Sequence, residues 1–282
     1  MGRASGGLPV IDGPVVVRRW IVPVPALPRA ADGLKLAHIS DLHLYRWNRT
    51  IEHARTLLLS LEYDVLLVTG NLCDDPHRWA DAAELCRRFF PHINPSGGTL
   101  AVLGHRDPPE LADQSDLGLT FLRNRSAVCR VNGSHVVLAG VEQSAHARGD
   151  VSGALSGVQT GQGAILLAHY PSTIHQVPAS HVSLTLAGHT LGGQLRLPLL
   201  GALRTGDRIS RQMARGLHVV RGRALHISAG LGVPSRFPWR LRCPPEITIL
   251  TLTVGNEAPT LKFTVPAAPR LRRRMVAAAL AV

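Results

Sequence analysis

Lysine, aromatic residues and paired cysteines are scarce in this chain of 282 residues. Lys35 and Lys262 are its only lysines, so the net charge of +12 comes almost entirely from arginine. Aromatic residues make up 4% of the chain and do not alternate with basic ones, which argues against a nucleic-acid-binding surface. The four cysteines form no CxxC pair, so we expect neither a zinc knuckle nor a disulfide framework, but reduced thiols in the cytoplasm.

Long apolar runs are also missing. Residues 15–28, VVVRRWIVPVPALP, are interrupted by arginines and prolines, and MVAAALAV at residues 275–282 is far shorter than the roughly 20 apolar residues of a spanning helix. No apolar core with a small-residue cleavage site opens the chain. We therefore expect a cytoplasmic protein with neither a secretion signal nor an N-terminal membrane anchor.

Two basic segments stand near the ends of the chain. They comprise Arg18, Arg19 and Trp20 near the start, and Arg270, Arg272, Arg273 and Arg274 before the apolar end. Both segments could face anionic lipid headgroups at the inner face of a membrane. Because an arginine- and alanine-rich chain is also typical of a GC-rich genome, the charge alone leaves the choice between a functional basic face and genome composition open.

The first half of the chain has the pattern of alternating strands and helices. A hydrophobic content of 45% and a mean hydropathy of +0.10 suit one large α/β domain. Apolar runs at 36–40, 64–69 and 99–103 are separated by helical patterns that begin near Thr50 and span 78–90. This order predicts a parallel sheet whose functional loops lie at the carboxyl ends of the strands.

The second half favours strands with little helix between them. They are expected at 127–131, 135–141, 164–168, 182–187, 217–220, 224–228 and 246–254. Arg221 and Gly222 are expected to form a hairpin turn, and residues 145–163, rich in Gly, Ser and Gln, a mobile surface loop. Two facing sheets in one domain, with helices outside, is the architecture that these patterns predict.

Side chains that can bind metals follow five of these strands. They are Asp41 and His43 in HISDLHL, Asn71 in VTGNLCDD, His105 in LGHRD, His169 in LLAHYP and His189 in LAGHTLGGQ. Asp41 and His43 are two residues apart, so an extended backbone directs both to one side. A lone histidine at a strand end is more often structural. Five strand ends that carry such residues together indicate a metal site.

From about residue 34 to 252 the chain resembles the calcineurin-like metallophosphoesterases. The five motifs above, together with ISAGLGVPSRFPWRLRCPPEITILTL near the end of the chain, are most similar to the branch of bacterial YkuE and YaeI type phosphodiesterases and the related UDP-2,3-diacylglucosamine pyrophosphatases. The resemblance implies a four-layer αββα sandwich that binds two divalent ions. It divides the chain into an N-terminal strand and extension at 1–33, the phosphoesterase-like domain at 34–266 and a basic, apolar tail at 267–282.

Several positions depart from the family's pattern. The DxH pair is intact, and the resemblance makes Asp41 and His43 ligands of a first metal. Asn71 replaces the bridging aspartate of GDxxD. The GNHD motif becomes GHRD, so His105 takes the place of a ligand asparagine and Arg106 that of the catalytic histidine. The GHTH motif keeps His189, but Leu191 stands where a first-metal ligand belongs.

These changes affect the two metal positions unequally. Asn71 offers the first position only a neutral carbonyl and Leu191 offers it no donor. Two dications about 3.5–4 Å apart repel by about 20 kcal/mol at an effective dielectric constant of about 20, and a bridging carboxylate normally offsets part of this. At the second position His105, His169 and His189 could form a three-imidazole set. We therefore expect one divalent ion (zinc, manganese or iron) or none.

Three functional hypotheses remain open. In the first, a pseudoenzyme binds a phosphorylated or lipid-linked small molecule, or a protein, and Arg106 clamps the phosphate; arginine cannot act as a general acid. In the second, a mononuclear phosphodiesterase or pyrophosphatase uses the three histidines. In the third, a peripheral membrane protein depends mainly on its basic ends. The four substitutions together remove a bridge, a ligand and an acid, which favours relaxed constraint on catalysis over specialisation of the site.

Overall fold

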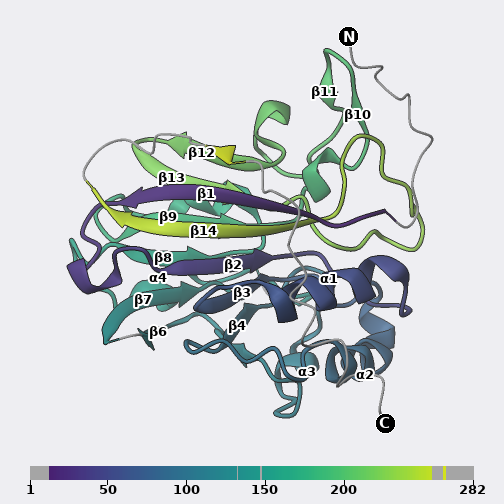
Figure 1. Ribbon diagram of the computed structural model, residues 1–282, viewed down its shortest axis with the longest axis horizontal. Helices are drawn as coiled ribbons and strands as arrows, with labels where there is room; N and C mark the ends of the chain where they lie inside the picture. Colours follow the sequence, from purple (N-terminus) through teal and green to yellow (C-terminus); the bar gives the residue numbers. More distant parts are fainter. Residues whose placement is uncertain (1–12, 132, 147, 256–262, 265–282) are drawn as a thin grey trace.

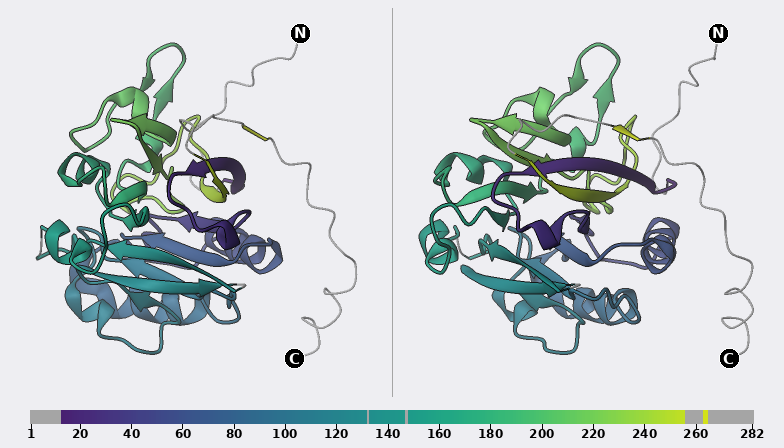
Figure 2. Two further views of the ribbon diagram at one scale, coloured as in Figure 1. Left: turned by 90° about the vertical axis from the view of Figure 1, so that its left-hand side faces the viewer. Right: turned by 60° about the vertical axis from the view of Figure 1, so that its left-hand side comes forward.

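A computed structural model describes residues 13–131, 133–146, 148–255 and 263–264. These residues form two β-sheets that face each other, with helices on the outer side of each sheet (Figures 1 and 2). The four-layer αββα sandwich expected from the sequence is confirmed. Its fourth layer is thin, because it consists of one short α-helix and short 3-10 turns.

The first sheet contains seven strands in the order β15-β1-β14-β2-β3-β4-β5. Their bounds are β1 Val16–Val24, β2 Lys35–Ile39, β3 Val65–Thr69, β4 Thr99–Val102, β5 Thr120–Phe121, β14 Glu246–Val254 and β15 Phe263–Thr264. Strands β2 to β5 are parallel, β14 runs antiparallel to β2, and β1 pairs in parallel with β14. Residues 16–24 are thus an integral part of this sheet.

The second sheet contains six strands in the order β12-β13-β9-β8-β7-β6. Their bounds are β6 Arg125–Val131, β7 Ser134–Gly140, β8 Ala164–Leu167, β9 Val182–Ala187, β12 Gly216–Val220 and β13 Arg223–Ile227. The hairpin between β12 and β13 turns at Arg221 and Gly222, both with positive φ, as predicted. Strands β10 (Arg196–Leu197) and β11 (Gly201–Ala202) form a separate small hairpin.

The two helices that the sequence periodicity predicts are present, together with two short ones, α3 and α4. They are α1 Arg49–Ser60, α2 Trp79–Phe89, α3 Pro109–Ala112 and α4 Val151–Leu155, with 3-10 turns η1 Arg29–Ala31, η2 Pro76–Arg78, η3 Pro171–Gln176, η4 Leu191–Gly193 and η5 Arg211–Met213. The side chain of Asn48 caps α1 by accepting from the N–H of Ile51 at 2.9 Å. The segment 145–163, expected to be a mobile surface loop, contains the short helix α4, which Asp150 caps.

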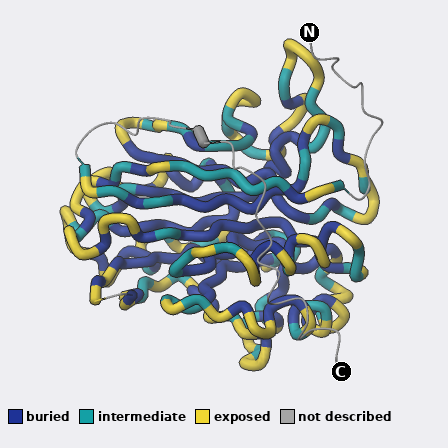
Figure 3. The backbone as a smooth tube through the Cα atoms, viewed as in Figure 1, coloured by how far each residue is buried: buried dark blue, intermediate teal, exposed yellow. Residues whose placement is uncertain are grey.

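Strand residues alternate between two apolar layers. Leu36 and Leu67 face the second sheet and pack against its Leu184, whereas Ala37 and Val68 face the helices. Figure 3 shows the buried strands across the middle of the molecule and the exposed residues at its margins. Burial on both faces explains why the parallel strands have continuous apolar sequences.

None of the helices in the described part of the chain is long and apolar enough to span a bilayer. Arg18, Arg19 and Trp20 lie on β1, and the Arg18 guanidinium pairs with Glu246. The arginine cluster at 270–274 and the tail at 267–282 lie outside the described residues.

Candidate metal centre

The predicted ligands converge at the carboxyl ends of strands from both sheets. Asp41 and His43 follow β2, and Asn71 follows β3, while His169 and His189 follow β8 and β9 of the second sheet. Asp41, His43, Asn71 and His189 all have positive φ, between 44° and 69°. Such backbone is costly for residues other than glycine and is concentrated at functional sites. The two sheets therefore meet at an edge where the chain holds strained loops.

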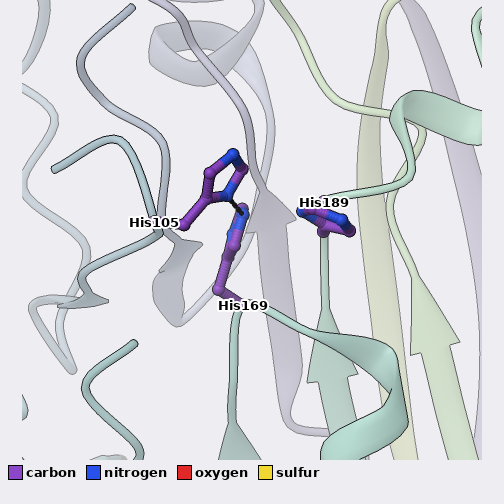
Figure 4. Close-up of side chains that lie close together, drawn as sticks. All are labelled: His105, His169 and His189. Atoms are coloured by element: carbon purple, nitrogen blue, oxygen red, sulfur yellow. Dashed lines mark hydrogen bonds between the residues drawn. The ribbon is translucent and has the colours of Figure 1, made fainter. Parts of the chain in front are cut away.

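Three histidines form a tight cluster at this edge. One ring nitrogen of each of His105, His169 and His189 lies within 4.8 Å of the others (Figure 4). His105 Nδ1 and His169 Nε2 are 3.1 Å apart and share a hydrogen bond. The spacing suits three imidazole ligands of one transition-metal ion.

Hydrogen bonds fix which nitrogen of two rings carries a lone pair. His169 Nδ1 lies 2.8 Å from the carbonyl of Thr69 and must donate to it, so its Nε2 is free to accept. His189 Nε2 donates to the carbonyl of Gly206 at 2.9 Å, which leaves a lone pair on Nδ1. That Nδ1 is buried and has no hydrogen-bond partner in the described part of the chain. A buried acceptor without a partner fits a missing metal ion.

Burial keeps the imidazoles of His105 and His169 neutral. Burial, together with the neighbouring rings of His169 and His189, lowers the pKa of His105 to about 3. Burial also holds the pKa of His169 well below its usual value of 6.5. Neutral imidazole is the form that binds metals, so these two rings are in their ligand form at neutral pH.

Asp41 and His43 lie beside the cluster in a buried polar network. Asp41 Oδ2 accepts from the hydroxyl of Ser40 at 2.7 Å and from the N–H of His189 at 2.9 Å. His43 Nδ1 lies 3.2 Å from Asp74 Oδ1, and its buried Nε2 lies 3.8 Å from Asp41 Oδ1 without a hydrogen-bond partner among the residues described. This half of the site therefore offers one carboxylate and one imidazole.

The amide of Asn71 has one chemically allowed orientation. Its Oδ1 accepts from the N–H of Arg106 at 3.1 Å, and its Nδ2 donates to Asp41 Oδ1 at 3.0 Å. Since a backbone N–H can only donate and a carboxylate only accept, reversing the amide would break both bonds. The carbonyl of Asn71 therefore accepts from Arg106 and its N–H groups face Asp41, while its role as a ligand of the first metal stays a prediction.

A cavity of about 530 Å³ opens beside these residues. Arg106 lines it, and one end of its guanidinium is held by the Asp74 carbonyl, which accepts from Nη1 at 2.6 Å. Leu191 also lines the cavity and brings no donor atom to it. The cavity therefore combines imidazole nitrogens, a guanidinium and an apolar wall.

Several supporting residues were missed by the sequence interpretation. Asp107 is fully buried and accepts from the N–H groups of Gly104 and Cys73 at 2.8 and 2.7 Å, and burial raises its pKa to about 6. Gln143 Oε1 accepts from the N–H of His169 at 2.8 Å, which fixes the start of that loop. Asp74 and Asp107 end the GDxxD-like and GNHD-like motifs, so the motifs could have identified them. Gln143 stands in no recognisable motif.

The chain matches no family model, but it is similar in sequence to several known proteins. The uncharacterized metallophosphoesterase YkuE of Bacillus subtilis is 28% identical over 240 residues, which cover 82% of either chain. The phosphodiesterase YaeI of Escherichia coli is 30% identical over 235 residues, covering 77% of this chain and 82% of its own. The solved structure of an archaeal phosphodiesterase aligns with 83% of this chain at a TM-score of 0.39 and 12% identity.

Proposed function

The chain belongs to the metallophosphoesterase family, and from this premise we propose that it binds a phosphate-bearing ligand beside a single divalent transition-metal ion, with little or no phosphodiester hydrolysis. The contrast between the two halves of the site carries this proposal. One half has three imidazoles whose ring nitrogens lie close enough to bind one ion, whereas the other presents amide N–H groups to its only carboxylate.

The hydrogen bond between Asn71 and Asp41 supports the loss of a metal pair. A dication at the first position would meet the Asn71 Nδ2–H groups, whose partial charge is positive, in place of a bridging carboxylate. Two dications at about 4 Å or less repel by about 20 kcal/mol in a medium of dielectric constant about 20. Without a bridging carboxylate, the negative charge that normally offsets this repulsion is missing. Leu191 supplies no compensating ligand.

The histidine cluster supports occupancy of the second position. His169 and His189 are oriented by carbonyl groups of Thr69 and Gly206, and such outer hydrogen bonds are typical of metal-ligating histidines. His105 completes the set if its Nδ1 releases the hydrogen bond to His169. Imidazole nitrogens favour zinc or iron over magnesium or calcium. A metal bound there would supply Lewis acidity to a phosphoryl oxygen.

Arg106 supports the binding of an anion. The Asp74 carbonyl holds Nη1, so the guanidinium is anchored at the cavity wall while its other N–H groups can reach a phosphate. Arginine cannot protonate a leaving oxygen because it keeps its proton at all ordinary pH values. The residue therefore fits ligand binding better than general acid catalysis.

A second candidate, a mononuclear phosphodiesterase, is favoured by the open cavity beside the three histidines. Catalytic zinc sites commonly have three protein ligands and a free position for water or substrate. Arg106 stands in the place of a general acid and cannot protonate a leaving group. An aryl phosphodiester has a good leaving group, so its hydrolysis does not need a general acid. The two candidates differ in turnover and agree in metal content.

Metal analysis of protein purified without chelator tests both candidates. We expect about one equivalent of a transition metal per chain, lost in His189→Ala and retained in the control His175→Ala, an exposed histidine of η3. Hydrolysis of bis-p-nitrophenyl phosphate that disappears in His189→Ala would favour the mononuclear enzyme. Two equivalents of metal, or none after incubation with Zn²⁺ or Mn²⁺, would overturn the proposed single-metal site.

A further inference from the structure

The β10–β11 hairpin carries unusually exposed leucines. It projects from the sandwich beyond the ends of the sheets, in the upper right of Figure 1 and at the top of both views of Figure 2. At its turn Leu199 is exposed to 107% of the reference value and Leu200 to 67%. Burying a leucine is worth about 1.5–3 kcal/mol, and exposed apolar side chains that form a contiguous patch mark interaction sites.

Further apolar side chains extend the patch toward the cavity. The loop after β13 runs beside the hairpin, and Gln194 Nε2 donates to the Phe237 carbonyl at 2.6 Å. The rings of Phe237 and Trp239 contact each other with centroids 5.2 Å apart. We call this exposed patch the leucine rim: Leu197, Leu199, Leu200, Leu203, Phe237 and Trp239.

The segment that carries the leucine rim is strongly basic. Residues 194–245 include ten arginines, and Asp207 is their only acidic residue. Arg204 lines the cavity together with Leu203, Arg236 precedes Phe237, and the exposed Arg211 stands on η5, which contacts β11. Within the described residues, the arginines that form ion pairs with carboxylates are Arg18, Arg78, Arg87 and Arg123, and none belongs to this segment. Among the described residues, no carboxylate therefore forms an ion pair with these arginines.

We propose that the leucine rim docks on an anionic lipid bilayer. Leu199 and Leu200 at the turn enter the boundary of the acyl chains, Trp239 lies at the level of the headgroups, and the exposed arginines contact lipid phosphates. A bilayer matches both features of the patch, because it offers an apolar interior directly beneath a layer of negative charge.

The shape of the patch also favours a bilayer over a protein partner. A standard protein interface buries about 800 Å² on each partner in closely matched surfaces. A three-residue turn that projects from the body offers little flat area, but it can enter a fluid interface with no complementary pocket. The two leucines would supply apolar area and the exposed arginines electrostatic attraction, the two contributions on which reversible attachment depends.

Docking would bring the cavity to the membrane surface. Leu203 and Phe237 belong to the leucine rim and also line the cavity, as does Arg204. The mouth of the cavity is therefore continuous with the docking surface. The attachment itself requires neither a metal ion nor hydrolysis, so it can hold or fail independently of the proposed function.

Sedimentation of the full chain with sucrose-loaded vesicles tests this proposal. We expect binding to vesicles of mixed phosphatidylcholine and phosphatidylglycerol, weaker binding to phosphatidylcholine alone, and release by salt. The double variant Leu199→Ser/Leu200→Ser should bind at least about tenfold more weakly, because it loses the apolar contribution while keeping every charge. Leu59→Ser, at an exposed leucine of α1, is the matched control and should bind as the unaltered chain does.

Quenching by brominated lipids locates the contact. Trp239→Phe should remove most of the lipid-dependent quenching of tryptophan fluorescence if the leucine rim is the part that docks. The proposal is overturned if the chain does not bind anionic vesicles, or if the double serine variant binds them as well as the Leu59→Ser control. It is also overturned if the double variant only converts a dimer to a monomer, which would assign the rim to a second copy of the chain.

Discussion

The side-chain amide nitrogen of Asn71 donates a hydrogen bond to Asp41 Oδ1 across 3.0 Å. Both groups are buried, and the opposite end of the Asn71 amide is held by the N–H of Arg106. The bond gives Asp41 Oδ1 a hydrogen-bond donor from within the protein. In the family's pattern, two carboxylates at these positions face a cation. Here an amide and a carboxylate bind each other instead.

Asn71→Asp should make the protein depend on a divalent cation for stability. The new carboxylate would face Asp41 at about the same distance, where two unit charges repel by about 5 kcal/mol at an effective dielectric constant of about 20. We expect a lower thermal unfolding midpoint than that of the unaltered chain in EDTA, and a larger rise on addition of Mn²⁺. Gln159→Glu adds the same charge at an exposed site and is the control. Equal Mn²⁺ responses of the two variants would contradict the role assigned to Asn71.

The fourfold variant Asn71→Asp, His105→Asn, Arg106→His and Leu191→His should bind two metal ions. It restores a bridging carboxylate, two ligands and an acid at once, which supplies the charge and donor atoms that a dication pair needs. The expected result is a rise from about one to about two equivalents of Mn²⁺, with hydrolysis of bis-p-nitrophenyl phosphate. Leu191→His alone serves as the control, since it leaves Asn71 facing Asp41. A fourfold variant that still bound at most one ion would mean that more than these positions has diverged.

Arg106→Ala should weaken the binding of phenyl phosphate by about tenfold or more, because a hydrogen bond to a charged group contributes about 1.5–3 kcal/mol. Arg106→Lys should recover part of the affinity but not the paired geometry. The measurement is isothermal titration of the metal-loaded protein, with Arg211→Ala, an exposed arginine of η5, as the control. Unchanged affinity in Arg106→Ala would exclude this guanidinium as the phosphate clamp.

Stability should fall as the pH drops below about 6.5, partly because of a buried histidine pair between the sheets. His38 Nδ1 and His226 Nδ1 are 2.9 Å apart, and burial lowers the pKa of His38 to about 3 and that of His226 well below 6.5. The unfolded chain takes up protons first on acidification, so each such histidine removes about 2 kcal/mol from the free energy of unfolding by about pH 5.

Denaturant unfolding in EDTA at about pH 7.5 and about pH 5 measures this loss. His226→Leu should reduce it by about 2 kcal/mol, since one buried titrating ring is removed. The exposed His175→Ala should leave it unchanged. A loss in His226→Leu as large as in the unaltered chain would show that the pair does not carry it.

The element pattern of the sandwich could be predicted from the sequence. Strands such as 182–187 and 246–254 were placed at their observed bounds because buried strands have long β-branched, apolar runs. Helix α4 was missed because its five residues, VSGAL, are too few to show a helical period. The pairing of β1 with β14 joins segments more than 220 residues apart, which local periodicity cannot indicate.

The sequence predicted which residues make up the candidate site, but not the hydrogen bonds that hold them in place. The motifs identified every histidine of the cluster, because ligand types at strand ends are visible in the sequence. They did not identify Gln143, which follows β7. Its side chain fixes the loop that carries His169 after the neighbouring strand β8. Such a contact depends on how the strands of the second sheet are ordered.

By itself, the sequence determined which donor atoms the cavity can contain, because side-chain chemistry is a property of each residue: an amide at 71 and an aliphatic chain at 191 cannot become ligands of the kind they replace. Only the tertiary structure decided that the Asn71 amide turns its nitrogen to Asp41, that His189 leaves Nδ1 free, and that Leu199 stands in solvent beside the cavity. These outcomes depend on partners from segments far apart in the chain, and folding alone brings those partners within hydrogen-bonding distance.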